Sequence, residues 1–193
     1  MRAFLGIDPG ATGALALYQP ETADLTVFDV PTLKIGKKTA VDHYALARIV
    51  DGMSTLNPEV WIEYVSASPQ MGVTSSFSFG QTYGLLVGVC AAHFLKINTV
   101  TPPVWKTAMK AKGDKDESRA RVCALLPHHS ALFARKKDNG RSDATLIAIY
   151  GATDEHPRPR PHRADPRGPT QLAGEAGTER RDARHDAAPR LAV

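Results

Sequence analysis

Apolar and polar positions in residues 1–151 alternate between the periods expected for strands and for helices. Apolar runs predict strands at residues 4–7, 14–18, 25–30, 60–62 and 97–100. Helical spacing of apolar residues predicts helices at residues 39–53, 76–94, 102–106, 118–126 and 142–150. Three strands followed by strands that alternate with helices predict an α/β fold. We therefore expect a mixed five-stranded sheet flanked by helices.

Capping residues set the expected ends of two of these helices. Thr39 and Asp42 match the S/T-x-x-D cap, which predicts that a helix begins near Thr39. Gly151 follows the last helix and is expected to be its C-terminal cap.

Glycines repeat every four residues within the helix predicted at 76–94, at Gly80, Gly84 and Gly88. A glycine in a helix interior costs about 1 kcal/mol relative to alanine. Three on one face therefore indicate that a backbone approaches closely there, either from the sheet or from another subunit.

The composition changes after Gly151. Residues 152–193 contain no Phe, Trp, Tyr, Ile, Met or Cys, and prolines alternate there with arginines. Such a segment cannot bury enough apolar surface to offset the entropy lost on ordering. The sequence therefore predicts one folded domain at residues 1–151 and a disordered Pro/Arg-rich tail at 152–193.

Composition excludes several classes of protein. The 193 residues are 42% hydrophobic, and the net charge of +4 is compatible with an anionic partner. Two cysteines, Cys90 and Cys123, are too few for a disulfide framework or a cysteine-ligated zinc site. The longest apolar run, residues 85–92, is too short to span a membrane. A cytoplasmic enzyme or binding protein is expected.

Three carboxylates occupy positions that a mixed sheet would bring together. Asp8 ends the first strand, Glu63 ends the fourth, and Asp143 opens the last helix. Taken singly, each has an ordinary structural explanation as a turn residue, a solvated strand end or a helix-dipole partner. Together they would repel one another unless cations neutralised them, and hard oxygen ligands favour Mg²⁺ or Mn²⁺. Two such ions would support hydrolysis of a phosphodiester.

Five motifs, in order, resemble the RuvC-type Holliday junction resolvases of the RNase H-like superfamily, particularly the short phage-type members. The resemblance covers about residues 1–151. The segments that carry it are Gly6-Ile7-Asp8-Pro9-Gly10, Ile62-Glu63, Gly80-Gln81-Thr82-Tyr83-Gly84, Val104-Trp105-Lys106 with Gly113-Asp114-Lys115, and Ser142-Asp143-Ala144.

The resemblance implies an RNase H-like fold in which Asp8, Glu63 and Asp143 hold two Mg²⁺ ions, with Mn²⁺ as a substitute. It implies a fourth carboxylate one helical turn before the last, but position 140 is glycine. Asp138 is the nearest candidate. The family's activity implies an endonuclease of DNA recombination and repair that resolves four-way junctions by paired nicks, leaving 5′-phosphate and 3′-hydroxyl ends. Two symmetric nicks imply a homodimer.

Basic residues flank the proposed metal site and are expected to contact the DNA backbone. Lys106 is also a candidate for stabilising charge on the scissile phosphate. The predicted DNA-binding set is Lys34, Lys37, Lys38, Lys106, Lys110, Lys112, Lys115, Arg135, Lys136 and Lys137.

Other functions remain open at this level. The same acids would serve a nuclease acting on flaps, forks or RNA. A non-catalytic module that binds branched nucleic acid is a further alternative. The turn at residues 8–13 also resembles the phosphate loop of actin-like ATPases, but those proteins need two such domains and this chain has room for one.

Overall fold

The computed structural model describes residues 1–36, 38–64, 72–113 and 115–153, all within the first of two compact units, residues 1–162. From residue 154 onward the predicted tail lies outside the described residues. Its disorder and the boundary at Gly151 therefore stay predictions. In the part of the chain that is described, no helix is both long and apolar enough to cross a membrane.

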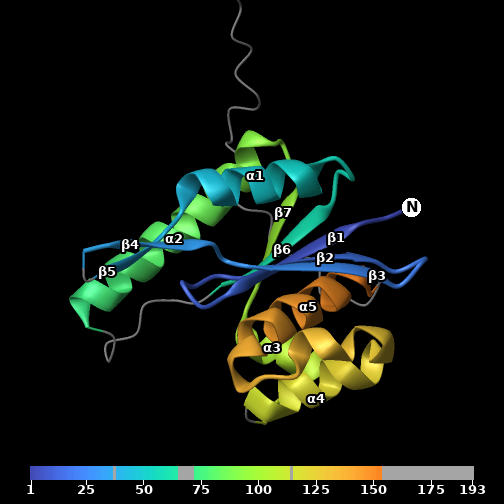
Figure 1. Cartoon of the computed structure of the whole chain (residues 1–193). Coiled ribbons are helices and arrows are strands. Elements are labelled where there is room, and N and C mark those ends of the chain that lie inside the picture. The colour runs from blue at the N-terminus through green and yellow to red at the C-terminus, as the bar shows by residue number, and fades with distance from the viewer. Residues whose placement is uncertain (37, 65–71, 114, 154–193) are drawn as a thin grey trace, which may run out of the picture. The chain divides into compact units, whose positions relative to one another are not determined.

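A mixed five-stranded sheet lies at the centre of the fold (Figure 1). Its strands are β1 Phe4–Asp8, β2 Ala14–Gln19, β3 Asp24–Asp29, β6 Glu59–Glu63 and β7 Ile97–Val100. They are arranged in the order β3-β2-β1-β6-β7. β1, β2 and β3 pair antiparallel, whereas β6 is parallel to both β1 and β7. The predicted mixed five-stranded sheet is confirmed.

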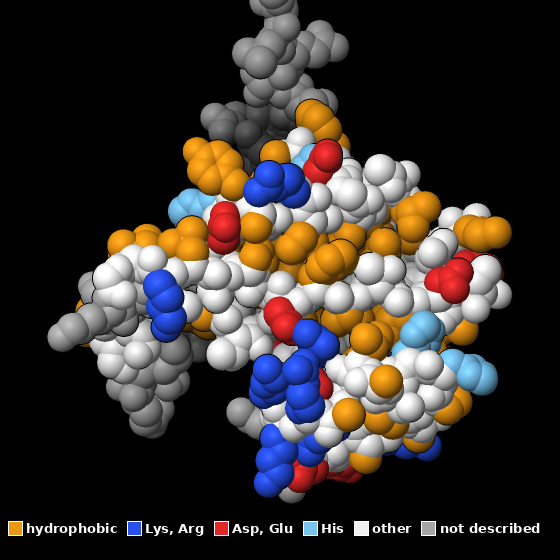
Figure 2. Space-filling model, viewed as in Figure 1, with side chains coloured by type: hydrophobic (Ala, Val, Ile, Leu, Met, Phe, Trp, Pro, Cys, Tyr) orange, Lys and Arg blue, Asp and Glu red, His pale blue; other side chains and the backbone are white. Residues whose placement is uncertain are grey.

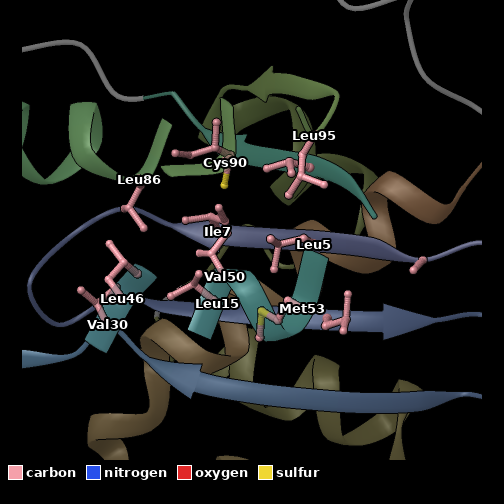
Figure 3. Close-up of a cluster of buried hydrophobic side chains, with 14 of the residues drawn as sticks. Leu5, Ile7, Leu15, Val30, Leu46, Val50, Met53, Leu86, Cys90 and Leu95 are labelled. Atoms are coloured by element: carbon pink, nitrogen blue, oxygen red, sulfur yellow. The ribbon is translucent and has the colours of Figure 1, made fainter. Parts of the chain in front are cut away.

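Helices cover both faces of this sheet because side chains alternate along its strands. On β1, Leu5 and Ile7 point into a buried cluster with α1 His43–Ser54 and α2 Val73–Ala92, and Figure 3 shows this cluster. Phe4 points to the opposite face and joins a second cluster. The elements on that face are α3 Pro102–Ala108, α4 Lys115–Leu125, η1 Pro127–Phe133, η2 Lys136–Asp138 and α5 Asn139–Ala152.

α5 packs directly against the backbone of β1 at Gly6. A Cβ atom on Gly6 would overlap the Ala144 carbonyl oxygen and the Ala148 amide nitrogen of the helix. Only glycine permits this approach, because it has no side chain to separate the two backbones. The contact fixes the position of α5, and therefore of Asp143, relative to the end of β1.

A two-stranded hairpin, β4 Thr32–Ile35 and β5 Lys38–Val41, precedes the first helix and was not predicted from the sequence. The predicted helix start at Thr39 is wrong, because Thr39 pairs with Lys34 in this hairpin. Asp42 is the actual cap: its side chain accepts a 3.0 Å hydrogen bond from the Ala45 amide.

One prediction about glycines is also wrong, and a second keeps only one of its two alternatives. Gly151 lies inside α5 against the Trp61 indole, and Thr153 is the residue that caps the helix. Nothing in the described chain lies within 4 Å of where Cβ atoms would stand on Gly80, Gly84 and Gly88. Among the described residues, the sheet is therefore not the backbone that approaches this face of α2, and an approach by another subunit stays a prediction.

Candidate active site

Asp8 and Glu63 lie at the ends of adjacent strands. β1 and β6 run parallel, with Ile7 opposite Ile62, so both strands end at the same edge of the sheet. The adjacency expected from the sequence is confirmed. In open α/β sheets this edge, at the carboxyl ends of the strands, is where sites form.

The first turn of α5 lies against Asp8. A Cβ atom built on Gly140 would stand 3.1 Å from Asp8 Oδ2 and 2.5 Å from the Thr12 carbonyl oxygen. The turn between β1 and β2 therefore occupies the space that a side chain at position 140 would need. This contact explains why a carboxylate is not accommodated at position 140, where the family resemblance calls for one.

Asp143 and Lys106 both act electrostatically on Glu63. Burial raises the pKa of the Glu63 carboxyl above its usual range, and the nearby Asp143 carboxylate raises it further. The Trp105 N–H and the Lys106 ammonium lower the same pKa in part. The elements thus bring Asp143 and Lys106 each within electrostatic range of Glu63. The assignment of these residues to one catalytic site stays a prediction.

Trp105 is a partner of Glu63 that the sequence did not single out. Its indole Nε1–H donates a 2.8 Å hydrogen bond to Glu63 Oε1, and its side chain is fully buried. In the sequence, only its position beside Lys106 in the segment Val104-Trp105-Lys106 pointed to the site. An ordinary core role would explain an apolar residue there equally well.

Asp138 is engaged elsewhere. Its buried carboxylate accepts a 2.9 Å bond from the Arg135 amide, and further bonds of 2.8 to 3.1 Å from the Arg135 guanidinium. These hydrogen bonds lower the pKa of the Asp138 carboxyl. To bind a metal ion, the Asp138 carboxylate would have to give up its hydrogen bonds to Arg135.

A second bidentate pair fastens α5 to the sheet. The Arg141 Nε and Nη2 groups each donate a 2.6 Å bond to the Asp29 carboxylate at the end of β3. Bidentate Arg–carboxylate pairs add geometric definition to a contact as well as energy. The pair was not predicted from the sequence. Together with Gly6 it sets where α5 begins.

Basic side chains gather beside this site. Figure 2 shows Lys and Arg side chains grouped over the region where Figure 1 draws α3 and α5. Lys106 is half-buried on α3, whereas Lys34 and the other described members of the predicted set are exposed: Lys110, Lys112, Arg135, Lys136 and Lys137. Lys37 and the side chains of Lys38 and Lys115 lie outside the described residues.

The donor set fits divalent metal ions of the Mg²⁺ class. Within the described residues, no three His, Cys, Asp or Glu side chains converge closely enough to form a metal site as they stand. The elements nevertheless direct three carboxylates to one edge, and repulsion between Glu63 and Asp143 is what a cation there would relieve. The ligand chemistry therefore matches a divalent cation of this class.

The raised pKa of Glu63 predicts how the stability of the folded protein changes with pH. Between its usual value of 4.5 and its higher folded value, the unfolded chain loses the proton first, so stability falls as pH rises. Glu63→Gln removes this penalty while keeping an acceptor for Trp105. We expect the variant to melt at a higher temperature than the wild type at pH 7.5, and at nearly the same temperature at pH 4.

Glu59 provides the matched control at the other end of β6. It pairs with Lys96 at 3.1 Å and accepts a 2.7 Å bond from Asn98, so Glu59→Gln is expected to lower the melting temperature at pH 7.5. A Glu63→Gln variant that melts below the wild type at pH 7.5 would contradict the electrostatic account of the site.

Asp138→Asn separates a structural role from a ligand role. Losing the charge opposite Arg135 is expected to lower the melting temperature by several degrees, as Arg135→Gln should also do. The stability that Asp138 contributes is present above its usual pKa of 3.8 and is lost as pH falls toward the lowered folded value. If Asp138→Asn alone abolished metal-dependent activity, while Arg135→Gln did not, Asp138 would be the fourth ligand.

Comparisons with known proteins agree with this architecture. No family model matches the chain. Its sequence is 32% identical over 144 residues to the chloroplastic Holliday junction resolvase MOC1 of Chlamydomonas reinhardtii. That alignment covers 68% of this chain and 16% of the length of MOC1. The sequence resemblance to Holliday junction resolvases is therefore confirmed for a segment much shorter than that relative.

The fold is similar to that of RuvC from T. thermophilus. A structure of that protein in complex with a Holliday junction substrate matches with a TM-score of 0.56 and 18% identity, covering 79% of this chain and 93% of that chain. A second Thermus thermophilus RuvC structure matches with a TM-score of 0.47 and 19% identity, covering 78% and 93%. The predicted RNase H-like, RuvC-type fold is confirmed.

Proposed function

We propose that this protein is a metal-dependent endonuclease that resolves four-way DNA junctions. The observation that supports this most directly is the electrostatic grouping of Glu63 with Asp143 and Lys106 at the edge where Asp8 ends β1. This grouping occurs in a fold similar to RuvC, and the sequence is similar to a Holliday junction resolvase. Branched DNA is the substrate class that these two similarities favour.

In this proposal Asp8, Glu63 and Asp143 hold two Mg²⁺ ions, for which Mn²⁺ substitutes. When bound, such ions activate water for attack on a phosphodiester and stabilise charge on the leaving oxygen. Asp8 and Glu63 orient the site from two adjacent strands, so their spacing is set by the sheet. Lys106 faces the same point from α3 and contacts the scissile phosphate. The products carry 5′-phosphate and 3′-hydroxyl ends.

The exposed lysines and arginines near α3 and α5 position the DNA through its phosphates. This contact carries no sequence information, and it predicts binding that weakens steeply as salt concentration rises.

Labelled substrates test the activity. The purified chain is incubated with a four-way junction, linear duplex, a flap and an RNA–DNA hybrid, with Mg²⁺, with Mn²⁺ and with chelator. We expect paired symmetric nicks in the junction that require metal. If only flaps or hybrids were cut, the protein would be a metal-dependent nuclease whose substrate is not the four-way junction. Tight junction binding without any cutting would favour the non-catalytic binding module instead.

A homodimer would supply the two nicks. α2 presents an exposed face that includes Gly80, Gly84 and Gly88, and the nearby Phe77 side chain is 66% exposed. Small residues on one helix face let a second backbone approach closely. We propose that this face pairs two copies related by a two-fold axis.

Gly84→Arg tests the dimer. A long charged side chain on the open face is expected to weaken association at least about tenfold, because it fills the space needed by the partner helix. Light scattering should then report the monomer mass, and junctions should receive unpaired single nicks. Gly52→Arg on the exposed face of α1, also with nothing within 4 Å, is the matched control and should leave association unchanged. A wild type that stays monomeric on junction DNA would remove the symmetric mechanism.

A further inference from the structure

The hydrogen bond between Trp105 and Glu63 links the hydrophobic core to the proposed metal site. Nε1 of Trp105 lies 2.8 Å from Glu63 Oε1, although the two residues are 42 positions apart in the chain. Glu63 is half-buried at the end of β6, whereas the Trp105 side chain is completely buried in the cluster under α5. The indole thus lies in the core with its one polar group facing the carboxylate.

The route of the chain explains why this contact is well defined. Glu63 pairs with Val100, the last residue of β7, and the Tyr64 amide donates a 2.8 Å bond to the Val100 carbonyl. Thr101 caps α3 directly afterwards, with Pro102 and Pro103 in its first turn. α3 therefore begins beside Glu63, and Trp105, in the second turn of this short helix, returns its indole to the carboxylate.

The chemistry of the indole restricts what the contact can do. An indole N–H only donates a hydrogen bond, so Nε1 of Trp105 can neither ligate a metal ion nor accept a proton. Its bond to Oε1 leaves Oε2 of Glu63 as the oxygen without this partner. A rigid donor on one oxygen limits the rotation of the carboxylate before any metal ion binds. Mutation of residues that hydrogen-bond to metal ligands typically lowers metal affinity by about 10–100-fold.

We propose that Trp105 is a positioning residue that orients the Glu63 carboxylate for metal binding. The inference rests on the proposed function, since it requires Glu63 to be a metal ligand. Lys106, the next residue, acts on Glu63 by charge, and its Nζ lies 5.3 Å from the Trp105 ring centroid. The two neighbours therefore have separable roles: Trp105 sets an orientation, and Lys106 supplies a positive charge.

Manganese binding to the full chain, without DNA, tests the proposal by the electron paramagnetic resonance signal of free Mn²⁺. Trp105→Phe keeps an aromatic ring and removes the donor. We expect its affinity for Mn²⁺ to fall about tenfold. Trp61→Phe, which changes the other tryptophan of the chain, is the matched control and should remain within about twofold of the wild type, since the Trp61 ring packs against Tyr150 of α5.

The effect should pass through Glu63. In a Glu63→Gln background, Trp105→Phe is expected to cause no further loss, because the oriented ligand is already gone. If Trp105→Phe binds Mn²⁺ like the wild type while Glu63→Gln binds at least about tenfold more weakly, the positioning role is wrong and the proposed metal site stands. If Glu63→Gln binds Mn²⁺ as tightly as the wild type, the proposed metal chemistry is wrong and the positioning role falls with it.

The wild-type protein provides a second readout, because Trp105→Phe leaves a cavity in the core and lowers stability. Nuclear magnetic resonance resolves the two indole N–H signals, and Trp61→Phe identifies which belongs to Trp105. Addition of Mg²⁺ is expected to shift the Trp105 signal, with the same midpoint as cation binding. A Trp105 signal that does not move while Mg²⁺ binds would overturn the proposal.

Discussion

Asp8→Asn is expected to lower the rate of junction cleavage by at least about a thousandfold while the protein stays folded and still binds junction DNA. Asparagine keeps the shape of the side chain but removes the negative charge that a divalent cation requires. Asp8 lies at the end of a central strand, with the first turn of α5 against its Oδ2 atom. Single-turnover cleavage at saturating enzyme measures the effect on chemistry separately from the effect on binding.

A matched control removes a similar charge away from the site. Asp51 lies on α1, and its side chain is 75% exposed, so Asp51→Asn should leave the cleavage rate nearly unchanged. The Asp8 variant should bind the junction at least as tightly as the wild type, because it loses a negative charge near the phosphates. An Asp8→Asn enzyme that is folded and cleaves at the wild-type rate would remove Asp8 from the metal site.

Gly6→Ala is expected to reduce the free energy of unfolding by about 3 kcal/mol or more. The added methyl group would overlap two backbone atoms of α5, at Ala144 and Ala148, which cannot rotate aside as a side chain would. The helix must move away from β1, and the core cluster around Phe4 and Leu146 loosens with it. Urea unfolding followed by circular dichroism measures the change.

Gly52→Ala is the control for this substitution. Gly52 lies in α1 with nothing within 4 Å of the added methyl group, so the variant should be more stable by about 0.5–1 kcal/mol. If both substitutions had the same sign, close packing of α5 on β1 would not be the reason for glycine at position 6. Because Asp143 is on α5, Gly6→Ala should also lower cleavage activity under conditions in which the variant remains folded.

The amino-acid sequence by itself determined the elements that depend on short-range patterns. Alternation of apolar residues located β1, β2 and β3, and the run at residues 60–62 located the strand that carries Glu63. The sequence also indicated that Asp8 and Glu63 end their strands, because a polar residue after a buried strand is visible in the pattern. The prediction that Asp143 opens the last helix is wrong, because α5 begins at Asn139 and Asp143 is its fifth residue. These features depend on residues that are close together in the sequence, so a short stretch of sequence is enough to predict them.

Tertiary structure decided what depends on contacts between distant segments. The hairpin of β4 and β5 has a weak local pattern, and its pairing, together with the true cap at Asp42, displaced the helix start expected at Thr39. Gly151 carries the residue type of a helix end but lies within α5 because Trp61 packs against it. Local preference was outweighed by packing in both places.

The same division holds within the candidate site. The sequence located Asp8, Glu63 and Asp143, and left Asp138 as a candidate ligand without showing its pairing with Arg135. It gave no sign that Thr12 fills the space beside Gly140, or that the Trp105 indole bonds to Glu63. Residue types that can hold a metal ion follow from chemistry and local position. Which carboxylate oxygen accepts a hydrogen bond, and from which buried neighbour, follows only from the packing of segments far apart in the chain. Burial and hydrogen-bond direction are properties of the folded chain.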